Sequence, residues 1–358
     1  MTTPAPAASA PTTKTRVPLW DNARFIAVTL VVIGHSIQRM TGASDGAYTI
    51  YLLIYSFHMP AFAVISGYFS KSDAPGPSQL KRVLTDILLP YFIMESIWSV
   101  VQFLVEGRQD FNPTKPCWTL WFLLALAIFR LVLPYLALIR FPLAWAVLLS
   151  IGIGYMSNVD NTFALSRTFG ILPFFVLGWK LKQWGLIDRW NEASARASLS
   201  VRGCAIVVLG AWLAVIILNA DDFRRMSLQH WFFFDDSYAA MDANPWWAGA
   251  ARLGVIVLAT VLIAAFLVLV PRVNTPVTSW GQATMYIYLL HTFVLYPIRE
   301  SGILQGADPP ALLLPGMILA AIAISLALGT PIVRRVFRPL IEPRASWLFV
   351  TKEGLLRK

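Results

Sequence analysis

Residues 248–270 read AGAARLGVIVLATVLIAAFLVLV, a run of 23 residues in which Arg252 carries the one charge. A helix needs roughly 20 mostly apolar residues to cross the hydrocarbon core of a bilayer, so this run predicts a membrane-spanning helix. The rest of the chain has the same character, because 57% of its 358 residues are hydrophobic and 13% are charged. A typical soluble domain has about 25% charged residues. This composition excludes an ordinary soluble domain and indicates that lipid surrounds most of the chain.

Nine further segments meet the same criterion of length and hydropathy. The sequence therefore predicts an all-α fold, a polytopic transmembrane bundle of about ten helices. The fifth segment is short, and leaving it out would reverse the orientation of every later one. The ten expected spans are 19–40, 48–69, 81–105, 118–139, 142–158, 164–183, 201–219, 248–270, 281–301 and 311–335.

Lysine and arginine residues indicate the orientation of these spans. With the N-terminus inside, 19 of them fall in cytoplasmic segments and 7 in outer segments, while Arg24, Arg130 and Arg252 fall within spans. Cytoplasmic loops of membrane proteins carry such an excess of basic residues. We therefore expect both termini in the cytoplasm and a multi-pass protein of the inner (plasma) membrane. The net charge of +10 then reflects topology, not binding to nucleic acid.

The two ends of the chain and one outer loop are polar. Residues 1–13 lack the charged segment and apolar core of a signal peptide. We expect a disordered cytoplasmic tail over 1–17, a membrane domain over 18–337 and a basic cytoplasmic tail over 338–358. The outer loop 220–247 places five aspartates beside an aromatic run. That loop either caps a cavity or anchors the chain at the membrane surface.

Ionisable side chains inside predicted spans are costly and by default mark function or a buried pair, and six of them are the candidates here. They are Arg24, His35, His58, Glu95, Arg130 and His291. Arg24 and His35 are eleven residues apart, close to three helical turns, so they share one face about 16 Å apart along the axis. Their shared face predicts a polar bundle interior. The alternative is an Asp21–Arg24 clamp with a hydrogen-bonded core histidine.

The remaining candidates leave alternatives open. Pro60 predicts a kink beside His58, which either opens room for a ligand or serves packing alone. Glu95 either orients a histidine or pairs with Arg130. With Arg39 at the outer end, the candidates suggest a polar column across the bilayer.

The residues of the column fit more than one function. The sequence has no metal-ligand spacing, no Gly-rich phosphate loop and no serine-nucleophile motif, so we expect no metal and no permanently bound cofactor. Histidines as general bases, with arginines for an anionic group, suit transfer to a hydroxyl. A proton path or a transporter would show the same residues.

Several short motifs in this order resemble the acyltransferase-3 family of membrane O-acyltransferases. The resemblance covers about residues 18 to 337. The motifs are WDNAR at 20–24 leading to VVIGH at 31–35, FHMP at 57–60 with ISGYF at 65–69, Lys81-Arg82 with LPY at 89–91, WFL at 121–123 and YIYLLH at 286–291.

This resemblance implies an activity and roles for the candidate residues. Members have about ten helices with both ends cytoplasmic, and they move an acyl group, often acetyl, from cytosolic acyl-CoA to a hydroxyl of a sugar or glycolipid bound for the envelope. On that basis His35 is the candidate base and Arg24 belongs to the same essential pair. Arg82, with Lys81 beside it, would hold the CoA phosphates, unless these two are only the ordinary basic flank of a span.

The other candidates receive secondary roles. Glu95 and His58 would orient or relay a proton, and Arg130 would assist with the CoA. His291 and Arg39 would face the acceptor substrate. The first-helix motif is also similar to that of actinobacterial members that acetylate trehalose mycolates. A glycolipid or sugar transporter, or flippase, remains the alternative function, whereas a purely structural scaffold poorly explains buried arginine and histidine together.

Overall fold

The computed structural model describes residues 16–107, 111–242, 246–305 and 310–349. Within those ranges every regular element is helical, as the sequence predicted, and all ten expected segments contain helix. The first half holds α1 (Pro18–Ile37), α2 (Asp45–Tyr55), α3 (His58–Tyr68), α4 (Pro77–Val83), α5 (Leu89–Glu106), α6 (Trp121–Leu136), α7 (Pro142–Ile153) and α8 (Leu165–Gln183). The second half holds α9 (Leu186–Glu192), α10 (Ala195–Leu218), α11 (Ala220–Arg225), α12 (Gln229–Phe233), α13 (Ala248–Leu269), α14 (Thr284–Glu300), α15 (Leu313–Leu328) and α16 (Pro331–Ile341).

Fewer helices than ten are long and apolar enough to span a bilayer. Within the described residues there are five, or six if α15 and α16, bent by 73°, form one span. The five are Asp45–Tyr68, Pro77–Glu106, Thr162–Gln183, Ala195–Leu218 and Ala248–Leu269. The helices α6 and α7 are apolar but have 16 and 12 residues. A span count of about ten, the cytoplasmic termini and the three-part division of the chain therefore stay predictions, and residues 1–15 of the expected tail lie outside the described ranges.

The predicted second span is broken. It divides into α2 and α3 at Ser56 and Phe57, so the kink expected from Pro60 is an interruption of the helix. Pro60 sits in the first turn of α3, where backbone N–H groups have no partner within the helix and a proline costs little. The Trp212 Nε1 donates to the Ser56 hydroxyl at the break, 3.2 Å away.

The tightest helix contact joins α3 to α8. A Cβ on Gly67 would lie 1.9 Å from the carbonyl oxygen of Phe175, and a Cβ on Gly178 would lie 1.9 Å from that of Val64. Membrane helices approach this closely only where a small residue leaves room for the partner's backbone. The two glycines therefore fix the position of α3 against α8.

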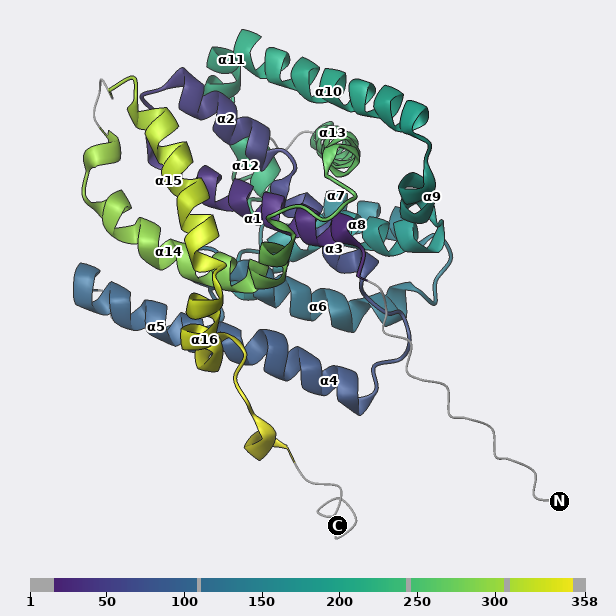
Figure 1. Cartoon of the computed structure of the whole chain (residues 1–358), viewed down its shortest axis with the longest axis vertical. Coiled ribbons are helices and arrows are strands. Elements are labelled where there is room, and N and C mark those ends of the chain that lie inside the picture. Colours follow the sequence, from purple (N-terminus) through teal and green to yellow (C-terminus); the bar gives the residue numbers. More distant parts are fainter. Residues whose placement is uncertain (1–15, 108–110, 243–245, 306–309, 350–358) are drawn as a thin grey trace, which may run out of the picture.

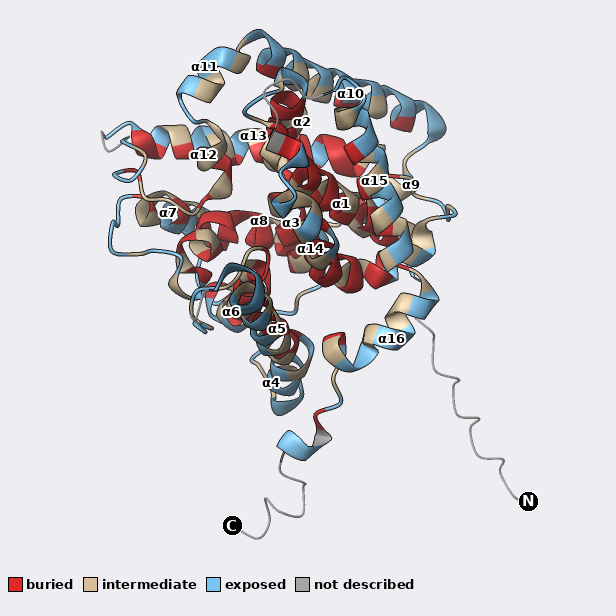
Figure 2. Cartoon of the chain, turned by 90° about the vertical axis from the view of Figure 1, so that its left-hand side faces the viewer, coloured by how far each residue is buried: buried red, intermediate tan, exposed pale blue. Residues whose placement is uncertain are grey.

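Burial separates an inner set of helices from an outer one. Figure 2 shows buried residues concentrated on α1, α3, α8 and α14, with α4 and α10 largely exposed. In Figure 1, α10 lies along one edge of the molecule and α4 with α5 along the opposite edge. In the span formed by α10, 11% of the most apolar window is buried, against 78% for the span of α2 and α3. The inner helices α1, α3 and α14 carry Arg24 and the three histidines singled out from the sequence, whereas Glu95 and Arg130 lie on α5 and α6.

Candidate functional site

Two cavities lie along the inner helices. We call the first the histidine cavity; its volume is about 390 Å³. The second, the arginine cavity, has a volume of about 360 Å³. The histidine cavity is lined by Val31, His35, Gln38, Tyr51, Tyr55, His58, Met59, Pro116, Trp118, Thr119, Trp121, Asn161, Arg167, Ile171, Phe232, Phe233, Tyr288 and Arg299. The arginine cavity is lined by Arg24, Phe62, Ile65, Ser66, Phe69, Asp86, Ile87, Phe122, Leu123, Leu126, Arg130, Thr284, Met285 and Tyr288.

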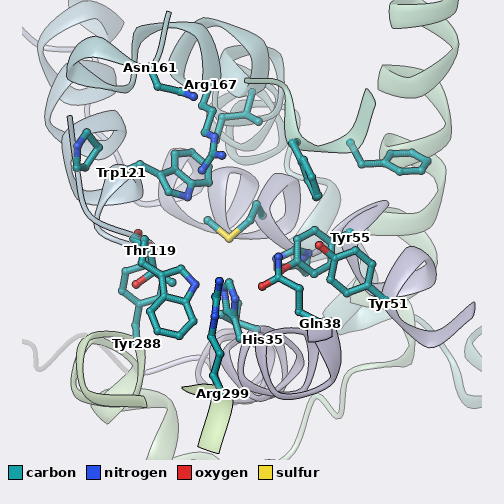
Figure 3. A pocket seen from close by; sticks show the side chains of 18 residues that line it. His35, Gln38, Tyr51, Tyr55, Thr119, Trp121, Asn161, Arg167, Tyr288 and Arg299 are labelled. Atoms are coloured by element: carbon teal, nitrogen blue, oxygen red, sulfur yellow. The ribbon is translucent and has the colours of Figure 1, made fainter. Parts of the chain in front are cut away.

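Three histidines from three helices converge at the histidine cavity. The rings of His35 and His291 have centroids 5.5 Å apart, and His35 and His58 both line the cavity. Figure 3 shows His35 pointing into the hollow beside Arg299. His291 is fully buried behind His35 and is not among the lining residues. The structure thus brings together the three histidines that the sequence placed on separate spans.

Backbone carbonyls orient two of these rings. The Nδ1 of His58 lies 2.9 Å from the Ile54 oxygen, and the Nδ1 of His291 lies 3.0 Å from the Ile287 oxygen. A carbonyl accepts only, so each Nδ1 carries the proton and Nε2 of the neutral ring is left as an acceptor. The Nδ1 of His35 is buried and has no hydrogen-bond partner among the described residues. Of the three rings, His35 is therefore the one whose Nδ1 is not held by a backbone carbonyl.

The rest of the histidine cavity combines aromatic faces with hydrogen-bonding groups. Trp118 lies edge-on to His35 at 5.8 Å, and Tyr55 stacks on Tyr51 at 3.9 Å. The Gln38 Oε1 is buried and has no partner among the described residues, and Asn161 adds a second amide. Aromatic rings with phenol and amide groups suit a ligand that carries both hydroxyls and apolar surface.

Sequence reasoning missed two arginines of this cavity. Arg167 pairs with Asp235 and lies 5.0 Å from the Trp121 ring centroid, and Arg299 lies 4.8 Å from that of Trp118. Both lie near the ends of predicted spans, where the sequence offers no sign that distinguishes them from ordinary outer flanking charges. Figure 3 shows them entering the cavity from opposite sides.

The segment that contains α12 forms part of the wall of the histidine cavity. Phe232 and Phe233 contribute to the lining, as a capping loop would. The loop is held to α13 by Arg252, which is buried and has its guanidinium carbon 4.7 Å from the Phe234 ring centroid and 5.5 Å from that of Tyr238. Within the described residues the Nε of Arg252 has no hydrogen-bond partner, so packing against aromatic faces is its main contact.

The arginine cavity is mostly apolar, with charge at its border. Arg24 forms an ion pair with Asp21 at 3.2 Å, and its guanidinium carbon lies 4.5 Å from the Phe69 ring centroid. The clamp considered as an alternative therefore exists, and Arg24 lines the cavity at the same time. Arg130 lies opposite, within electrostatic range of Asp86 and Arg82.

Glu95 lines neither cavity and its hydrogen bond goes elsewhere. Its Oε2 accepts from the backbone N–H of Cys117 at 2.9 Å, and Tyr91, one turn earlier on α5, donates to the Pro113 oxygen at 2.6 Å. The structure places Glu95 with neither a histidine nor Arg130. It instead holds the loop that presents Trp118, a residue with a positive φ of 44°, to the histidine cavity.

The remaining candidate residues line neither the histidine cavity nor the arginine cavity. Lys81 and Arg82 are exposed on α4, and the Lys81 Nζ lies 4.5 Å from the Phe349 ring centroid. Arg39 pairs with Glu300 at 3.4 Å and does not line the histidine cavity. No group of three His, Cys, Asp or Glu residues in the described ranges is arranged to hold a metal ion.

One motif residue has a structural task. Asn22 is fully buried, and its side-chain nitrogen donates to the Pro271 oxygen at 2.9 Å. Its Oδ1 accepts from the hydroxyls of Thr275 at 3.0 Å and Thr278 at 2.7 Å. Asn22 therefore ties the segment before α14 to α1, which leaves Arg24 as the residue of this motif that reaches a cavity.

Comparison with known proteins identifies a family and a relative that this chain resembles. Residues 18–330 match the model of the acyltransferase domain family, acyltransferase-3. A stretch of 181 residues is 27% identical to nodulation protein NolL of Mesorhizobium japonicum and covers 46% of this chain and 47% of that protein. The chain thus spans about half the length of this curated relative. No solved structure matches.

Proposed function

Because the chain belongs to the acyltransferase domain family, we propose that it is a membrane O-acyltransferase that moves an acetyl or short acyl group from acyl-CoA to a hydroxyl of an envelope carbohydrate or glycolipid. One observation carries this proposal. Arg24 and His35, on one face of α1, enter two different cavities. One has mostly apolar walls with Arg24 and Arg130 at its border, and the other combines histidine, phenol and amide groups with two further arginines. A two-substrate transfer can use one such compartment for each substrate.

The arginine cavity suits the donor. Apolar walls accept the uncharged arm of acyl-CoA, and Arg24 with Arg130 favours its polar and anionic groups. Lys81 and Arg82 lie exposed on α4, where they are available to the phosphates at the mouth. The excess of basic residues in these segments supports a cytoplasmic location for this side of the protein, in an inner membrane and with both termini inside.

The histidine cavity suits the acceptor and the chemistry. The His35 imidazole takes the proton of the acceptor hydroxyl as the oxygen attacks the thioester carbonyl carbon. The C–S bond then breaks, and the proton passes to the departing CoA thiolate, so that an ester and free CoA leave. His58 and His291 lie close enough to His35 to orient it or the acceptor. Glu95 supports this step by holding the loop of Trp118.

Radiolabelled acetyl-CoA tests the proposal directly. The purified protein in lipid nanodiscs is expected to transfer label to one member of a panel of envelope sugars and glycolipids, with trehalose mycolate included because of the first-helix motif. Free CoA should appear in equal amount. A glycolipid transporter or flippase would leave the label on CoA with every acceptor, and that result would reject the acyltransferase.

A further inference from the structure

The two cavities follow the same helices in the same order. On α1, His35 belongs to the histidine cavity and Arg24 to the arginine cavity. On α3, His58 lines the histidine cavity, and Phe62, one turn later, lines the arginine cavity. The cavities therefore lie end to end along the inner helices and are not separate hollows on different faces.

Tyr288 is the one described residue that lines both cavities. It is 7% exposed, and its hydroxyl donates to the backbone oxygen of Thr119. In Figure 3 Tyr288 and Thr119 lie together at the border of the hollow. The ring of Phe122 lies 6.3 Å from Tyr288 and 6.1 Å from Phe62, so the three rings form a wall at the level where one cavity ends.

This wall separates the two substrates of the proposed transfer. The donor thioester enters the arginine cavity, whereas the acceptor hydroxyl and His35 are in the histidine cavity. A reacting pair must come within about 3–3.5 Å, so the barrier between them must open. A hydrogen bond to a loop carbonyl, added to the packing of a side chain, gives a discrete contact that is present when the wall is closed and broken when the side chain moves. Tyr288 is the member of the wall with such an anchor.

We infer that Tyr288 is a partition between the donor and acceptor cavities, closed by its bond to Thr119 and displaced when both substrates are bound. It is a positioning residue: it takes no part in bond making. The inference rests on the proposed function. Its purpose follows from the competing reaction, in which water attacks the thioester carbon and yields free carboxylic acid and CoA. A closed wall keeps water away from the thioester until an acceptor is present.

The first test compares transfer with hydrolysis. Tyr288→Ala is expected to raise acceptor-independent hydrolysis of acetyl-CoA relative to transfer by roughly tenfold. Tyr288→Phe keeps the ring but loses the anchor, so a smaller rise is expected. Tyr286→Ala removes a buried tyrosine from the same helix that lines neither cavity, and it should leave the ratio unchanged. An unchanged ratio in an active Tyr288→Ala protein would overturn the inference.

A second test does not depend on catalysis. His35→Cys, in a background of Cys117→Ser and Cys204→Ser, is treated with a membrane-impermeant thiol reagent applied to one face of oriented vesicles at a time. With Tyr288 present, labelling from the cytoplasmic face should be slow; with Tyr288→Ala it should accelerate roughly tenfold. Equal rates in the two proteins would refute the partition. If Tyr288→Ala accelerates labelling but the protein does not use acetyl-CoA, the partition stands and only the proposed function is refuted.

Discussion

The histidine cavity and the arginine cavity share their helices but not their chemistry. Both contain two arginines, but the first adds imidazole, phenol and amide groups from helix segments near one end of α1, whereas the second has mostly apolar walls near the other end. A single turn of α3 changes the lining from His58 to Phe62. The difference shows that position along a helix, more than the choice of helix, decides which task a residue is given.

The largest effect is expected from a substitution at Gly67, which should disturb both cavities. Gly67→Ala forces α3 away from α8, because the new Cβ would lie 1.9 Å from the Phe175 oxygen. Overpacking costs about 1–3 kcal/mol, so the folded fraction and the melting temperature should fall, and both substrates should bind poorly. Gly210→Ala on exposed α10, where a Cβ meets nothing within 4 Å, is the matched control. If both variants melt alike, the glycine contact does not hold the two cavities in line.

His35→Ala should affect the histidine cavity alone. Loss of a general base typically lowers the rate by about 10²–10⁴-fold, so transfer should nearly vanish while acetyl-CoA binding, measured by equilibrium dialysis, persists. The arginine cavity is some three turns away on α1 and is undisturbed. Transfer at the parent rate would remove His35 from the chemistry, and lost binding would show that the cavities do not work separately.

Arg130→Ala should affect the arginine cavity alone. A hydrogen bond to a charged group contributes about 1.5–3 kcal/mol, which corresponds to a rise in KM for acetyl-CoA of roughly 10–100-fold with little change in kcat. Arg82→Ala removes an exposed charge, so its rise should be only about 2–5-fold. Steady-state kinetics with varied acetyl-CoA measures both. A fall in kcat with an unchanged KM would place Arg130 in the acceptor step.

A small effect, confined to kcat, is expected from Glu95→Gln. The amide oxygen still accepts from the Cys117 N–H but without the negative charge, a loss of about 1 kcal/mol. The loop of Trp118 then loosens, and kcat should fall about fivefold at constant KM for acetyl-CoA. Glu95→Leu, which cannot accept, should cost more. Equal kinetics for all three proteins would separate this loop from the histidine cavity.

The sequence predicted what depends on helical periodicity. An eleven-residue spacing places Arg24 and His35 on one face in any straight helix, and α1 is straight enough to keep them there. The inward face of α1 followed from the same rule. These predictions needed no knowledge of neighbouring helices.

Contacts between distant segments could not be predicted. Glu95 finds its partner in a loop 22 residues away, and nothing in either local sequence pairs them. Arg167 and Arg299 enter the histidine cavity through side chains long enough to reach inward from helix ends. The Ser56 hydroxyl at the helix break accepts a hydrogen bond from Trp212, 156 residues later. Such features arise from packing, and a single sequence records them only indirectly.

The way His58 and His291 are held has a consequence for variation. Their anchoring oxygens belong to the main chain at Ile54 and Ile287, so exchanging either side chain leaves the acceptor in place. Glu95, by contrast, anchors its loop through a carboxylate that one nucleotide change can remove. The hydrogen bonds that orient these two imidazoles therefore do not depend on which side chain stands at position 54 or 287, and both positions can vary without removal of the acceptor.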